Sequence, residues 1–153
     1  MKRLVITGLL ALTMLGPVAH AVDTETMPVA NAGNRDYAAG KKAVERRDWA
    51  SAAASFRKVV DAEPENADGY NMLGFSLRWM GKMDDAFAAY DRALQLNPKH
   101  KGALEYSGVA YLKADQPAKA NEQLVRLEQV GGKYSDEYRD LAKAISDYNA
   151  GRR

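Results

Sequence analysis

The sequence contains no cysteine among its 153 residues. This absence excludes disulfide bridges, thiolate metal sites, a cysteine nucleophile, a covalently attached c-type haem and a bacterial lipoprotein anchor, each of which needs a cysteine sulfur. Histidine is also scarce, since the chain has two and His20 lies in the N-terminal apolar segment. We interpret the other, His100, between Lys99 and Lys101, as a solvated turn residue and not as a metal ligand or base.

Other catalytic groupings are missing from the sequence as well. Ser107 has no histidine or aspartate at a predictable range, and Gly131-Gly132-Lys133 lacks the rest of a phosphate-binding loop. Nothing assembles a nucleophile, a base and a stabilising group. The sequence therefore predicts a protein that is not an enzyme and uses no metal and no cofactor.

Long apolar runs are confined to the N-terminus. Two cations, Lys2 and Arg3, precede an apolar run from Leu4 to Leu15, which is short of the roughly 20 residues that span a bilayer. A small-x-small pattern ends at Ala21. We predict that residues 1–21 are a signal peptide, so that the chain is exported with no stable membrane anchor after cleavage. A bacterial periplasm is the expected location, and secretion is the alternative.

The mature chain has no excess of either charge. Removal of the leader leaves 20 basic and 20 acidic side chains, because two of the 22 cations and none of the 20 acids lie in it. Binding to nucleic acid or to a membrane surface would need a basic stripe. The balance therefore indicates neither role.

What the sequence does contain is a period of 34 residues. It relates three glycines, three alanines and two prolines, namely Gly40, Gly74 and Gly108, Ala52, Ala86 and Ala120, and Pro64 and Pro98. A period held through so many positions indicates a repeat architecture. Each glycine costs about 1 kcal/mol of helix propensity relative to alanine, so we expect close helix packing at these sites, with the alanines facing them.

The best-formed repeat resembles the tetratricopeptide repeat. The residues that carry the resemblance are Tyr70, Leu73, Gly74, Leu77, Gly81, Ala86, Tyr90, Ala93 and Pro98. This resemblance implies an all-α right-handed α-solenoid of three helix-turn-helix repeats, at 33–66, 67–100 and 101–134, within a repeat domain at 33–149. A capping helix at 135–149, a flexible lead-in at 22–32 and a tail at 150–153 complete the predicted organisation.

Several helix boundaries follow from the pattern. The expected helices are 34–46, 49–62, 68–80 and 83–96, with a further helix beginning at Pro117 and a final one from Ser135 to about Asn149. Asp48 is a candidate N-cap, and Ser135 or Asp136 can cap the last helix. Proline suits the first turn of a helix because its fixed backbone angle is already helical.

The resemblance also implies a concave groove lined by the first helix of each repeat. Its expected residues are Tyr37, Lys41, Val44 and Glu45, then Asn71, Phe75, Arg78 and Trp79, then Glu105, Val109, Leu112 and Lys113, and finally Arg139 and Lys143. Whether Trp79 lines the groove or packs in the core stays open. The family's lysine and asparagine clamp for a peptide carboxylate is a poor match, because Tyr37, Met72, Gly102 and Tyr106 stand beside Lys41 at the relevant positions.

These features predict a non-enzymatic scaffold or adaptor for protein–protein interaction in the bacterial periplasm. The groove would bind another protein or a peptide segment, whose identity the sequence does not give. The alternative is a structural protein that forms homo-oligomers through its ends or its convex face. Neither role involves nucleic acid.

Overall fold

A computed structural model describes residues 34–151, and seven helices occupy most of that range. They are α1 (Arg35–Glu45), α2 (Trp49–Ala62), α3 (Ala67–Trp79), α4 (Met83–Leu96), α5 (Lys101–Lys113), α6 (Pro117–Gly131) and α7 (Asp136–Ala150). No strand occurs in this range, so the prediction of an all-α fold is confirmed. The predicted signal peptide and lead-in lie outside the described residues.

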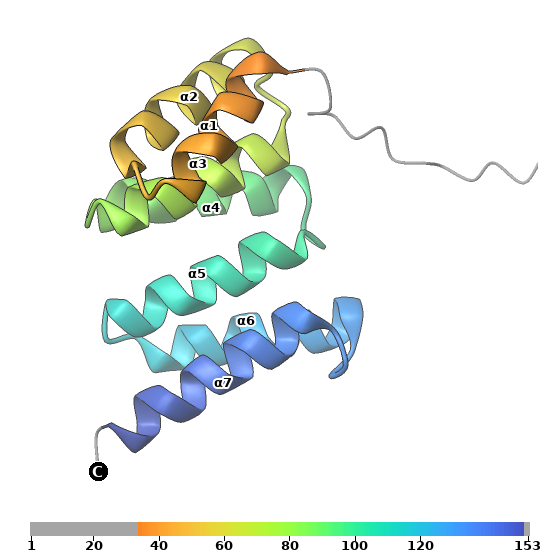
Figure 1. Cartoon of the computed structure of the whole chain (residues 1–153). Helices are drawn as coiled ribbons and strands as arrows, with labels where there is room; N and C mark the ends of the chain where they lie inside the picture. The colour runs from red at the N-terminus through yellow and green to blue at the C-terminus, as the bar shows by residue number, and fades with distance from the viewer. Residues whose placement is uncertain (1–33, 152–153) are drawn as a thin grey trace, which may run out of the picture.

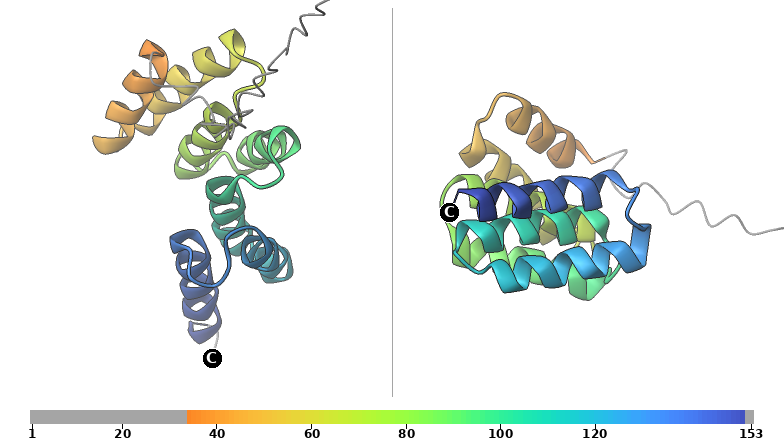
Figure 2. Two further views of the ribbon diagram at one scale, coloured as in Figure 1. Left: turned by 90° about the vertical axis from the view of Figure 1, so that its right-hand side faces the viewer. Right: turned by 90° about the horizontal axis from the view of Figure 1, so that it is seen from below.

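The helices form a curved stack of antiparallel hairpins (Figure 1). Each helix packs on the next along the chain, and α3 with α5 and α5 with α7 also meet across the repeats. Figure 2 (left) shows α1, α3, α5 and α7 in one column and α2, α4 and α6 in the other. The odd-numbered column is the concave one, because α1 and α7 reach further to its side than α3 and α5.

Side-chain caps begin five of the helices. Asn34, Asp48, Asn66, His100 and Ser135 each accept a backbone N–H from the first turn that follows. The capping roles predicted for Asp48 and Ser135 are therefore confirmed, with acceptor distances of 3.1 and 3.3 Å. Pro117 occupies the first turn of α6, where its missing N–H leaves no helical hydrogen bond unmade.

The prediction that His100 is a solvated turn residue was wrong. Its side chain is 12 % exposed, and Nδ1 accepts the Ala103 N–H at 3.1 Å as the cap of α5. Its Nε2 lies 2.8 Å from Oδ1 of Asp68 at the start of α3. A neutral ring whose Nδ1 accepts carries its proton on Nε2, which then donates to Asp68. The histidine thus connects the second repeat to the third.

The three turns within the repeats share one backbone conformation. Arg47, Gly81 and Asp115 all have positive φ angles, of 57°, 76° and 58°. They are separated by the 34-residue period, so each hairpin is closed by a residue in the left-handed region. Glycine adopts this region without cost, whereas arginine and aspartate do not.

The core consists of two clusters of buried side chains. The first is centred on Phe56, Leu73 and Tyr90, from α2, α3 and α4. The second joins the end of α4 to α5, α6 and α7 through residues such as Leu94, Leu127 and Leu141. Tyr70 packs against both clusters. The helix α7 therefore covers the end of the second cluster, as expected of a capping helix.

The periodic glycines mark sites of close packing, as predicted. A Cβ atom at Gly40 would lie 2.7 Å from the Phe56 ring, and one at Gly74 would lie 2.8 Å from the Tyr90 ring. At Gly108 it would approach the Leu141 side chain. Ala86 faces Gly74, as expected, since its carbonyl oxygen would lie 3.1 Å from a Cβ atom there. The nearest atoms at all three glycines nevertheless belong to larger side chains, which the sequence did not predict.

Candidate binding groove

Four aromatic side chains form one connected patch, which we call the aromatic patch: Trp49 from the start of α2, and Phe75, Trp79 and Tyr106 from the odd-numbered helices. Phe75 of α3 is central, with ring centroids 5.9 Å from Trp49 and 5.0 Å from Tyr106 of α5. Aromatic pairs favour such edge-to-face and tilted arrangements. The patch therefore joins side chains from three helices that belong to three different repeats.

Trp79 lies at the surface, which answers the question that the sequence left open. Its indole stacks on Trp49, with centroids 5.1 Å apart and ring planes at 10°. Trp79 is nevertheless 47 % exposed. An indole that is held in place and still half exposed can offer rigid contact area to a partner at little entropic cost.

A cavity of about 310 Å³ opens beside the two stacked indoles. Its lining residues are Val44, Glu45, Arg47, Trp49, Phe75 and Trp79. The end of α1, the turn to α2 and the last turns of α3 supply them. Val44 and the three aromatic rings form the apolar part of its wall, and Glu45 and Arg47 form a polar part of similar extent. The aromatic part can receive an apolar side chain of a ligand.

Two cations lie over the same aromatic rings. The Arg78 guanidinium carbon is 5.3 Å from the Phe75 centroid and 5.1 Å from that of Trp79, and the Lys113 Nζ is also 5.1 Å from the Trp79 centroid. These distances are typical of cation–π interactions. Arg78 is 6 % exposed, and its Nε has no hydrogen-bond partner in the part of the chain that the structure describes.

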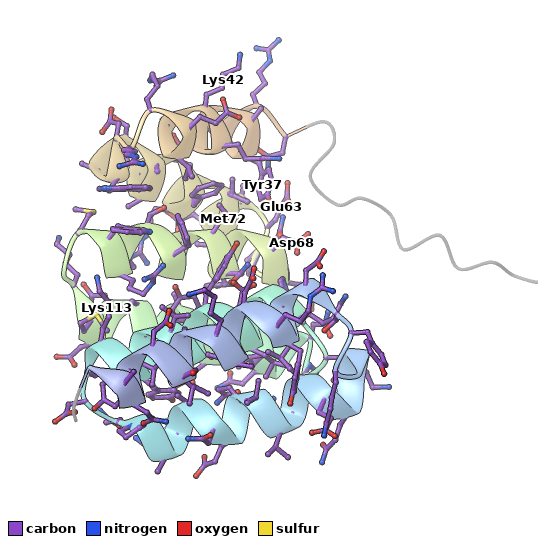
Figure 3. The ribbon with its side chains drawn as sticks, turned by 60° about the horizontal axis from the view of Figure 1, so that its bottom comes forward. Tyr37, Lys42, Glu63, Asp68, Met72 and Lys113 are labelled. Atoms are coloured by element: carbon purple, nitrogen blue, oxygen red, sulfur yellow. The ribbon has the colours of Figure 1, made fainter. Side chains whose placement is uncertain are left out.

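Tyr37 lies at the other end of the odd-numbered helices, near the start of α1. Its ring meets Phe56 edge to face at 5.4 Å. Burial first, and then the charge of Asp68, raise the pKa of Tyr37 to about 12. Figure 3 shows Tyr37 and Met72 between α1 and α3, with Asp68 towards that end and Lys113 at the other. Tyr37 and the acid Asp68 thus lie towards one end of the odd-numbered helices, whereas the cations Arg78 and Lys113 lie beside Trp79 towards the other.

A half-buried acid, Glu105 of α5, lies between these ends. Burial raises its pKa to about 7, and the charges of Asp140 and Glu137 on α7 add to the shift, while Arg78 opposes it. Tyr90, behind Arg78, is fully buried, and burial raises the pKa of its phenol well above the usual range. Although Arg78 lies close enough to oppose that shift, the Tyr90 hydroxyl makes no hydrogen bond of ordinary geometry to the described residues.

Some of the remaining predicted groove residues are buried in the core, and others are exposed to solvent. Leu112 is 8 % exposed and packs in the second core cluster, so its assignment to the groove was wrong. Val109 packs partly against the same cluster, and Asn71 is buried to 6 % exposure. Lys41 and Glu45 are exposed.

The capping helix presents its two predicted cations to solvent. Arg139 forms an ion pair with Asp136, and the Lys143 Nζ lies 2.6 Å from Oδ2 of Asp147. Both partners belong to α7 itself. These cations are therefore neutralised locally, unlike Arg78 and Lys113.

Sequence reasoning missed Trp49 and Tyr106. The family pattern assigns groove positions to fixed places on the first helix of each repeat, whereas Trp49 opens the second helix of its repeat. Tyr106 was considered only as a departure from the carboxylate clamp. The available signal was aromatic character, because Trp49 and Trp79 are the two tryptophans of the chain.

Neither metal-binding nor membrane-spanning features occur in the described part of the chain. Residues 34–151 bring together no group of three or more histidine, cysteine, aspartate or glutamate side chains that could hold a metal ion. No helix among them has the length and apolar character needed to cross a membrane.

The architecture defines a helical-repeat protein built from stacked hairpins. The family model of the tetratricopeptide repeat matches residues 67–100, which are α3 and α4 with their turns. Solved structures with this repeat extend the likeness to most of the chain. The chain therefore contains a tetratricopeptide repeat at residues 67–100, and its fold is similar to that of solved tetratricopeptide-repeat structures.

Three solved structures illustrate the likeness. The TPR2B domain of yeast Sti1 in its pHsp70 complex has a TM-score of 0.68 at 20 % identity, over 76 % of this chain and 95 % of that one. The TPR2AB–pHSP90 complex of yeast Sti1 also gives 0.68, at 19 % identity, over 74 % of this chain and 45 % of that one. The type III secretion translocator chaperone SycD of Yersinia enterocolitica gives 0.65 at 16 %, over 76 % and 87 %. No curated protein sequence matches the chain.

Proposed function

We propose that this protein is an exported, non-enzymatic interaction module that holds a segment of a partner protein on its concave side. The observation that carries the proposal is the aromatic patch. Its Trp79 is half exposed, is fixed by stacking on Trp49, and borders a cavity that three aromatic rings line in part. Tryptophan in such a position is typical of the residues that dominate binding energy at protein interfaces. Complexes among the similar structures, such as those of Sti1, support a binding role for the fold.

The bound segment is expected to be held by its side chains and not by its terminal carboxylate. The positions at which the family's clamp would place lysine and asparagine around Lys41 hold Tyr37, Met72, Gly102 and Tyr106. Tyr37 is engaged with Phe56, and Met72 packs against the first core cluster. An extended or helical segment with an apolar anchor suits this surface better.

The test of the binding role is a quantitative pull-down with the wild-type chain and the Phe75→Ala/Trp79→Ala variant as baits, using envelope extract of the source bacterium. We expect the double variant to lose at least one partner that the wild type retains. Val125→Ala is the matched control, because Val125 is 54 % exposed but lies on α6, outside the concave column. Identical partners for all three baits would overturn the proposal.

Export requires a separate experiment. The leader pattern supports cleavage after Ala21 and location in the periplasm. N-terminal sequencing of the protein from a periplasmic fraction should find Val22 as its first residue. A chain that retains residues 1–21 and stays in the cytoplasmic fraction would contradict export without bearing on the groove.

A further inference from the structure

Arg78 is a buried cation without an ion pair. Its 6 % exposure removes most of its hydration, and no carboxylate lies within 4.0 Å of it among the residues that the structure describes. A buried charge is costly unless it is paired. The faces of Phe75 and Trp79 offset part of this cost, but an aromatic ring is a weaker partner than a carboxylate.

Glu105 does not neutralise this cation. It lies close enough for the charge of Arg78 to act on it, yet its pKa is still raised to about 7 by burial and by the acids of α7. At neutral pH about half of the Glu105 carboxyls therefore carry no charge. An excess of positive charge remains on this part of the groove.

Lys113 adds a second cation to the same site. Its Nζ lies over the Trp79 ring at 5.1 Å, it is exposed, and it forms no ion pair within residues 34–151. Of the other predicted groove cations, Arg139 and Lys143 are paired within α7, whereas Lys41 of α1 is exposed and is in no ion pair within residues 34–151. Arg78 and Lys113 differ from Lys41 because both lie over the Trp79 ring.

The cavity beside the stacked indoles adjoins this cation pair. Trp79 is common to both, because it lines the cavity and also lies beneath Arg78 and Lys113. Phe75 likewise lines the cavity and contacts the Arg78 guanidinium. A ligand that occupies the cavity thus has cations within reach of its neighbouring groups.

We propose that the partner segment is acidic, with an aspartate or glutamate carboxylate bound between Arg78 and Lys113 and a neighbouring aromatic or aliphatic side chain in the Trp49–Phe75–Trp79 cavity. This inference rests on the proposed function and specifies its ligand. It places the carboxylate on side chains that are outside the family's terminal-carboxylate clamp. The bound segment can therefore be internal to the partner chain.

The test uses tryptophan fluorescence, since both tryptophans of the chain, Trp49 and Trp79, lie in the proposed site. The probes are pools of eight-residue peptides, N-acetylated and C-amidated so that no terminal carboxylate is present. One pool combines glutamate with phenylalanine or leucine, a second combines lysine with the same apolar residues, and a third combines glutamate with serine. We expect the first pool to bind the full chain at least tenfold more tightly than the other two.

The variants Arg78→Gln and Lys113→Gln test whether these two side chains bind the carboxylate of the peptide. We expect each to weaken the acidic apolar pool by roughly tenfold, in line with loss of a hydrogen bond to a charged group. The matched control is Lys119→Gln, because the Lys119 Nζ also lies over a tyrosine ring, Tyr111, at 5.3 Å but comes from α6. It should bind as the wild type does. Lys113 is exposed, so its variant tests the proposal even if Arg78→Gln fails to fold.

Several results would overturn the inference. The first is that the pool with lysine binds as tightly as the pool that combines glutamate with phenylalanine or leucine, or more tightly. The second is that Lys113→Gln binds this acidic apolar pool as tightly as the wild type does. The third is that no pool binds the wild-type chain. Each leaves the proposed function standing if the pull-down still shows a partner that depends on Phe75 and Trp79. If no partner depended on Phe75 and Trp79, in contrast, the proposed binding role of the groove would itself be contradicted.

Discussion

The indoles of Trp49 and Trp79 stack with their planes 10° apart, although 30 residues separate them in the sequence. Trp49 opens α2 and Trp79 ends α3, so the contact joins the first repeat to the second at the surface. Surface side chains normally contribute little to stability. This pair is expected to contribute more, because its rings also adjoin Phe75.

The first prediction concerns this indole pair. A double-mutant cycle with Trp49→Ala and Trp79→Ala should give a coupling free energy of about 0.5–1.5 kcal/mol, the usual range for aromatic pairs beyond their area burial. Urea unfolding of the wild type, both single variants and the double variant measures it. Strictly additive losses would show that the two rings do not interact energetically.

The second prediction concerns Gly74. Its replacement by alanine should lower the free energy of unfolding by roughly 1–3 kcal/mol, because a Cβ atom there would lie 2.8 Å from the Tyr90 ring and 3.1 Å from the Ala86 carbonyl oxygen. This loss would outweigh the gain in helix propensity. Chemical unfolding measures the change, and a variant as stable as the wild type would show that the hairpin can open to admit a methyl group.

The third prediction concerns the turn at Arg47. Arg47→Gly should raise the free energy of unfolding by about 1 kcal/mol, because Arg47 has a φ of 57°, where an L-residue with a side chain is strained. Arg46→Gly is the control, since Arg46 precedes it with a φ of −85°. Glycine there relieves no strain. If both variants changed stability alike in thermal or urea unfolding, the strain argument would fail.

The fourth prediction concerns pH. The folded pKa of Glu105 is raised to about 7 from an ordinary value of 4.5, so folding opposes its ionisation. This group therefore does not change stability below about pH 4.5, lowers it as pH rises from about 4.5 to about 7, and lowers it no further above that range. Glu105→Gln removes the group that ionises, so it should stabilise the protein at pH 8 and have much less effect at pH 5.

Urea unfolding at both pH values measures this difference. Glu122→Gln on the exposed side of α6 controls for the loss of one negative charge. Stabilisation by Glu105→Gln of the same size at pH 5 and pH 8 would contradict the proposed cost of ionisation.

The sequence was sufficient to predict most of the fold. The 34-residue period placed the helices, and the predicted ranges of α2 and α4 agree with the structure residue for residue. The prediction of these ranges succeeds because helix starts, helix ends and small residues at helix contacts are recognisable from neighbouring residues. The same signals also occur in each of the three repeats. The caps Asp48 and Ser135 are local in the same way.

The site was harder to predict, because it depends on contacts between repeats. Leu112 occupies a groove position in the family pattern, but α7 and α6 complete a core around it. His100 looks solvated beside two lysines until Asp68, 32 residues earlier, is brought to its Nε2. Trp49 is part of the aromatic patch because the packing of α3 on α2 places the Trp79 indole against the Trp49 indole. Spacing along one helix does not contain this information.

The division of the core into two clusters bears on the groove. The side chain of Tyr70 contacts both clusters, and α4 packs on α5 less extensively than α2 packs on α3. The second repeat therefore has a smaller helix contact with the third repeat than with the first. The contacts of Phe75 with Tyr106 and of Trp79 with Lys113 run across this same junction, from α3 to α5. A ligand bound to side chains of both helices would add contacts across this junction, so occupancy of the concave side would also strengthen the attachment of the third repeat to the second.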